Sequence, residues 1–80
     1  MLVKEFLTGF AGFDDTTVVF RDDARREIAR GHLRGILQAV REPEKCHDYT
    51  LKRLLSMELQ GCRHDSMAPY EYITIYVGRW

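Results

Sequence analysis

The chain has 80 residues, and its 12 Lys and Arg balance its 12 Asp and Glu, so the formal net charge is zero. A chain of this length buries only about 60–65% of its unfolded surface, so we expect one domain, residues 1–80, with one modest core. Hydrophobic residues at 45% and charged residues at 30% are ordinary globular proportions and argue against disorder.

The sequence also indicates the cellular compartment in which we expect the protein. No apolar run approaches the roughly 20 residues of a membrane helix, and Lys4 and Glu5 interrupt any secretory pattern at the start. Two cysteines without a secretory segment are typical of a reducing compartment. We therefore expect a cytoplasmic protein with no membrane contact.

The first predicted element is a short helix over residues 1–10. Its apolar residues recur at helical spacing, and these are Val3, Phe6, Leu7 and Phe10. Gly9 then ends the pattern. A helix of about two turns is unstable alone, so we expect it to dock on the rest of the domain.

The second block contains the clearest strand of the first half, over residues 16–20, where β-branched and aromatic residues gather. Residues 24–31 are ambiguous. Either residues 22–25 are a hairpin turn and residues 26–30 its returning strand, or this segment begins one long helix over residues 24–41 that Asp23 caps. Residues 33–41 are helical under both interpretations.

The third block, residues 46–64, is also ambiguous, because its leucines fit a helix over residues 51–59 and equally alternate as in a strand. Residues 70–77 form a strong strand, with Ile73, Ile75 and Val77 on one side. Such a strand needs a neighbour, and the nearest candidate is residues 53–62. This argument favours a strand in the third block.

Two stretches carry a resemblance. The run DDTTVVF at residues 14–20, and the pairing of KRLLSMEL at 52–59 with YITIYV at 72–77, resemble a loose group of small accessory proteins from bacteria, phages and mobile elements. The likeness spans most of the chain, but it is a pattern and not a motif, so it transfers no catalytic residue. It implies the order helix, hairpin, helix, hairpin.

We therefore predict a single α+β domain in that order, with a small antiparallel sheet and helices on one face. The alternative is one strand, one long helix over residues 24–41, a second helix over 51–59 and a last strand.

Cysteine and histidine occur together twice, as Cys46-His47 and Cys62-Arg63-His64. Zinc sites usually place two or more residues between paired ligands, which these clusters do not, so we predict no metal site. No serine or cysteine sits in a known nucleophile context. We expect no catalytic residues and no cofactor.

Two groups of side chains are candidates for partner binding. An aromatic stripe follows one side of the last strand: Tyr70, Tyr72, Tyr76 and Trp80. It either packs under the first helix or forms an interface, since Tyr and Trp carry much interface energy. An arginine cluster lies in the second block: Arg25, Arg26, Arg30 and Arg34.

The arginine cluster belongs to residues 21–41, which carry six arginines against three acidic residues. On a helix, Arg26, Arg30 and Arg34 line up, whereas on a hairpin the arginines flank the turn. Such residues can contact an acidic protein or phosphates. Aromatic residues beside basic ones also hold single-stranded RNA, but the sequence does not show whether the two groups are neighbours.

We expect a non-enzymatic protein that binds another protein. The resemblance implies a phage or mobile-element accessory protein, an inhibitor that blocks a host factor such as a defence nuclease in the manner of an anti-CRISPR protein. One alternative is a nucleic-acid-binding module that uses the arginines of residues 21–41. The other is a structural homo-oligomer, such as a homodimer joined through the last strand.

Overall fold

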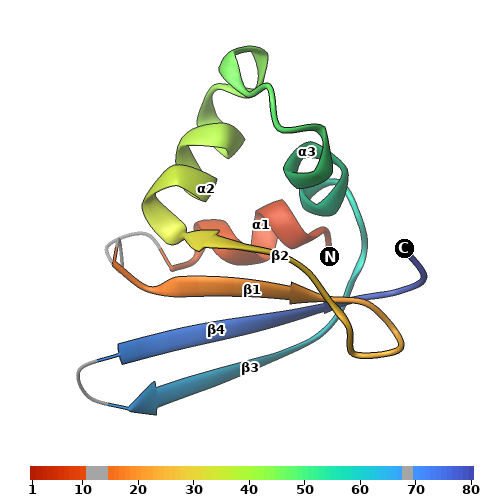
Figure 1. Ribbon diagram of the computed structural model, residues 1–80. Helices are drawn as coiled ribbons and strands as arrows, with labels where there is room; N and C mark the ends of the chain where they lie inside the picture. The colour runs from red at the N-terminus through yellow and green to blue at the C-terminus, as the bar shows by residue number, and fades with distance from the viewer. Residues whose placement is uncertain (11–14, 68–69) are drawn as a thin grey trace.

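A computed structural model of the chain describes residues 1–10, 15–67 and 70–80, except for the side chains of Met67 and Tyr70 (Figure 1). The elements follow in the order α1 (Val3–Thr8), β1 (Thr17–Arg21), β2 (Glu27–His32), α2 (Leu33–Arg41), a 3-10 turn η1 (Pro43–Lys45), α3 (Tyr49–Leu55), β3 (Leu59–Met67) and β4 (Tyr70–Val77). None of the helices among these residues is long and apolar enough to cross a membrane.

The strands form one sheet in the order β2-β1-β4-β3, and the helices lie together on one side of it (Figure 1). This confirms the α+β class, with β1 and β2 as a hairpin and β3 and β4 as a second one. The sheet is mixed and not wholly antiparallel, because β1 and β4 run parallel at its centre. The two strands richest in β-branched and aromatic residues take the central positions, and the connection through α2 and α3 supplies the crossover that a parallel pair needs.

The third block divides differently from the prediction, since the expected strand over residues 53–62 begins only at Leu59. The preceding residues form α3, whose first turn is capped by Asp48, with its Oδ1 accepting from the backbone N–H of Leu51 at 3.0 Å. Leu54 and Leu55 of this helix are buried. The leucine spacing that fitted both structures therefore serves a helix first and a strand afterwards.

The core lies between the helices and the face of the sheet that they cover. The sheet contributes Val18, Phe20, Ile73, Ile75 and Val77, and the helices contribute Val3, Leu7, Leu33, Ile36, Leu37, Leu54 and Leu55. The parallel register sets Val18 beside Ile73 and Phe20 beside Ile75, so these four side chains form one continuous apolar surface. All of the fully apolar positions of β4 point to this side, which leaves the tyrosines on the other.

Candidate binding surface

The face of the sheet opposite the helices is the candidate site, and we call it the open face. No described element covers it (Figure 1). Strand register assigns its members, because side chains alternate between faces and paired residues share one. They are Thr17, Val19 and Arg21 of β1, Glu27, Arg30 and His32 of β2, Gly61, Arg63 and Asp65 of β3, and Tyr72, Thr74 and Tyr76 of β4.

Two tyrosines of the predicted aromatic stripe, Tyr72 and Tyr76, lie half-buried on the open face. They do not pack under the first helix, since α1 is on the other side of the sheet (Figure 1). The ring of Tyr76 lies over its neighbour Gly61, where an added Cβ would be 3.9 Å from Cδ2 of the ring. Tyr70 begins β4, but its side chain lies outside the described part of the chain.

Trp80 does not continue the stripe. β4 ends at Val77, so the alternation of side chains no longer holds at the end of the chain. The Trp80 ring instead meets the guanidinium of Arg53 on α3, whose Cζ lies 4.2 Å from the ring centre. Because α3 belongs to the helical layer, Trp80 is held on the opposite side of the sheet from Tyr72 and Tyr76.

A β-bulge at Ile28 shapes the arginine side of the open face. The register pairs Phe20 with Ala29 but Arg21 with Glu27, so Ile28 is the extra residue. In a regular strand Glu27 and Arg30 would point to opposite faces, and the bulge brings them to the same one. Arg30 donates two hydrogen bonds to Glu27, from Nε to Oε2 at 2.9 Å and from Nη2 to Oε1 at 2.5 Å.

This ion pair perturbs both partners. The hydrogen bond from Arg30 lowers the pKa of Glu27, and the bond to Glu27 raises the pKa of Arg30. Tyr72, on the same face two strands away, makes the smallest contribution to the raised pKa of Arg30. Val19 lies between Arg30 and Thr74 in the register and is only 5% exposed although no helix covers it.

The structure therefore brings together parts of both predicted groups. Arg30 lies on the same face as Tyr72, and Arg21, a member of the wider arginine segment, is the register partner of Tyr76. Arg21 was not singled out from the sequence, because its place on this face depends on the parallel pairing of β1 with β4. On β3, Arg63 pairs with Asp65, from Nε to Oδ1 at 3.0 Å.

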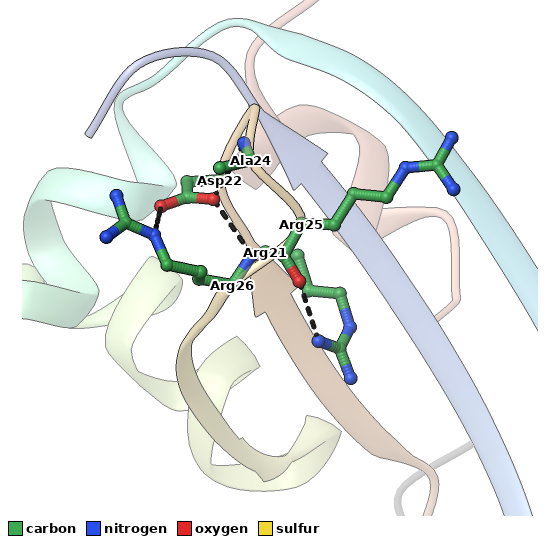
Figure 2. A network of polar contacts seen from close by, with 5 residues as sticks. All are labelled: Arg21, Asp22, Ala24, Arg25 and Arg26. Carbon is green, nitrogen blue, oxygen red and sulfur yellow. Dashed lines mark hydrogen bonds and ion pairs between the residues drawn. The ribbon is translucent and has the colours of Figure 1, made fainter.

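The hairpin between β1 and β2 is held by a buried carboxylate, Asp22, which is 4% exposed (Figure 2). Its Oδ1 accepts from the backbone N–H groups of Ala24 and Arg26, both at 2.9 Å, and its Oδ2 accepts from Nε of Arg26 at 3.2 Å. These bonds to the ionised form lower the pKa of Asp22, the backbone bond from Arg26 most of all. The carboxylate thus adds to the backbone bonds that close the turn, from the Arg25 N–H to the Asp22 carbonyl at 2.9 Å and from the Asp22 N–H to the Arg26 carbonyl at 3.0 Å.

At the tip of this hairpin Arg25 has a left-handed backbone, with φ at 64°, a conformation that favours glycine. Its carbonyl accepts from Nη1 of Arg21 at 2.9 Å. Its own guanidinium is exposed, makes no bond to any described residue, and points away from the Asp22 pair (Figure 2). A left-handed residue is a common part of short hairpin loops, and here the Arg25 N–H closes the turn on the Asp22 carbonyl at 2.9 Å.

The other two predicted arginines lie elsewhere. Arg26 is engaged with Asp22, and Arg34 sits in the first turn of α2, with Nη2 at 3.9 Å from Oδ1 of Asp15. The helical alignment of Arg26, Arg30 and Arg34, which belonged to the alternative with one long helix, does not occur, because the hairpin separates these residues. Arg25 and Arg26 do flank the turn, as the hairpin interpretation predicted.

Cys46 is half-buried and Cys62 is exposed, and both are free thiols. In the part of the chain that the structure describes, no three His, Cys, Asp or Glu side chains gather as a metal site would require.

Comparison with protein-family models, with curated proteins and with solved structures finds no match to this chain.

We predict that stability depends on the ionised Asp22. A lowered pKa means that the folded state is favoured above the unfolded value of about 3.9, and that this contribution is lost as pH falls through the folded pKa. Asp22→Asn should lower the thermal midpoint at about pH 7 by roughly 4–8 °C, and the gap should close by about pH 2. Thermal unfolding followed by circular dichroism across pH measures this.

Asp23→Asn is the matched control, since Asp23 is exposed and its side chain makes no bond to a described residue. We expect it to follow the wild type throughout. A gap that stays constant from neutral to acidic pH would contradict the role given to the Asp22 carboxylate.

We also predict that Arg25→Gly stabilises the protein, by roughly 0.5–1 kcal/mol, because glycine adopts the left-handed conformation without strain. Urea unfolding at equal protein concentration measures this difference. Arg26→Gly should have the opposite sign, since it removes the ion pair with Asp22. If both glycine variants lose stability, the strain at Arg25 is not what the backbone angle indicates.

Proposed function

We propose that this protein acts by binding a macromolecular partner through the open face, without catalysis. The observation that carries the proposal is the position of Tyr72 and Tyr76, which are on a central strand of a sheet whose apolar side chains are already used on the other face. Tyrosines on an uncovered face beside arginines are the side chains that most often provide binding energy.

One candidate partner is another protein. The sequence resemblance supports the concrete version, in which a phage or mobile-element accessory protein blocks a host factor such as a defence nuclease. The half-buried tyrosines fit this candidate, since aromatic and arginine side chains are enriched in protein interfaces.

A second candidate partner is nucleic acid, and one observation favours it. Arg21 is the register partner of Tyr76, and Arg30 lies on the same face as Tyr72, two strands away. Basic and aromatic side chains in this arrangement bind single-stranded nucleic acid. Both candidates use the same surface, so one pair of variants tests the surface for either.

We predict that Tyr72→Ser/Tyr76→Ser folds but loses its partner. The purified protein is immobilised and exposed to a bacterial lysate, with and without nuclease treatment, and the retained material is identified. The matched control is Tyr49→Ser, because Tyr49 lies on α3 in the helical layer and is 80% exposed. Binding by the control and not by the double variant supports the open face as the site.

Sedimentation of the same three proteins distinguishes these two candidates from a third arrangement, in which the open face joins two copies of the chain. A wild-type mass at a multiple of 9.4 kDa that falls to the monomer in the double variant would assign the face to a homodimer. Equal retention of one partner by all three proteins would show that the open face is not the binding surface.

A further inference from the structure

We propose that the ligand of the open face is single-stranded nucleic acid. Bases stack on Tyr72 and Tyr76, and Arg21 of β1 and Arg25 of the hairpin tip contact phosphates. This inference rests on the proposed function, because it names the partner of the same surface.

The spacing of the two tyrosines carries the first step. They are four residues apart on one strand, so their Cα atoms are about 13 Å apart at roughly 3.3 Å per residue. Thr74, a half-buried polar residue, lies between them, and the aliphatic Val19 is only 5% exposed. The tyrosine rings are therefore two separate platforms and not one continuous apolar patch.

Separate platforms suit bases better than they suit a folded protein. A protein interface has a packed, largely apolar centre, which this face does not present. An extended single strand presents one flat aromatic surface per nucleotide, and every base can stack on a side-chain ring. A span of about 13 Å lets two bases stack with further nucleotides between them.

The charges of the face supply the second step. Its two carboxylates are already occupied, Glu27 by Arg30 and Asp65 by Arg63. Arg21 donates to a backbone carbonyl and is the register partner of Glu27, whose pKa it helps to lower, so that one carboxylate faces two arginines. The surplus is therefore positive, and it lies beside Tyr76, where a phosphate next to a stacked base would be.

Arg25 extends this surplus beyond the edge of the sheet. Its strained backbone is fixed to the guanidinium of Arg21, and its own side chain is exposed and unbonded to described residues (Figure 2). A glycine would be easier to accommodate there, whereas the arginine at this position presents a charge that a ligand can contact. An anionic group bound by the Arg25 guanidinium provides that contact.

Fluorescence anisotropy with labelled oligo(dT) and oligo(U) of about 15 nucleotides tests the inference directly. At about 50 mM NaCl we expect a dissociation constant of roughly 10⁻⁴–10⁻⁶ M. Tyr72→Ser/Tyr76→Ser should weaken it at least about tenfold, and Tyr49→Ser should not. A duplex of the same length should bind more weakly, because its bases are not free to stack.

The salt dependence tests the arginines separately. Two phosphate contacts, from Arg21 and Arg25, give a slope of log affinity against log salt of about −1.4, at roughly −0.7 per contact for a single strand. Arg25→Gly should reduce the slope by about 0.7 and weaken binding, although the same substitution stabilises the fold. Asp23→Asn, on the same hairpin tip, should leave affinity unchanged or raise it.

Several results would overturn the inference. These are no anisotropy change at about 50 mM NaCl with protein near 1 mM, equal affinity for single strand and duplex, or equal binding by the tyrosine double variant. If oligonucleotides fail but a protein survives nuclease treatment and is lost with the double variant, the nucleic-acid inference falls and the binding face stands. If the double variant behaves as the wild type in both assays, both proposals fall.

Discussion

The parallel pairing of β1 with β4 is the contact on which the rest of the structure depends. It sets Val18 beside Ile73 and Phe20 beside Ile75, which creates the surface that every helix needs. Helix α1 has only six residues and cannot persist without that surface. Because side chains alternate, the same register places the tyrosines on the other face, and a slip of one residue would exchange the two. The core and the candidate site are therefore fixed by one set of backbone bonds.

Irregularities at the two edges adjust the open face without disturbing this centre. The extra residue in β2 turns Glu27 toward Arg30 and leaves Ile28 packed against the core. A second register shift, between Leu59 and Gly61 of β3, keeps Leu59 with the core and brings Gly61 opposite Tyr76. An aromatic ring over a strand glycine compensates for the missing side chain. Both bulges thus let an edge strand serve the core and the open face at once.

The sequence predicted those elements whose residue pattern fits only one type of secondary structure. The strand at residues 70–77 and the helix at 33–41 match β4 and α2 because their periodicities are unambiguous. Residues 51–59 could not be assigned to a helix or a strand from their pattern, since a helix ends and a strand begins within them. The helix is fixed by the Asp48 cap and by the burial of Leu54. Only part of the site could be predicted from the sequence. The alternation of side chains indicated the tyrosines, whereas the position of Arg30 on the same face depends on a bulge and a long-range strand pairing that periodicity does not encode.

The hairpin tip shows how the fold can hold an unfavourable backbone where a charge is displayed. Three bonds to Asp22 and one from Arg21 fix residues on both sides of Arg25. A left-handed arginine persists only where the surroundings determine the backbone so completely. The same rigidity lowers the entropy lost when the side chain meets a ligand, because the loop is already ordered. The well-bonded turn thus holds the Arg25 guanidinium, which makes no bond to a described residue, on an ordered loop, as the phosphate contact proposed above requires.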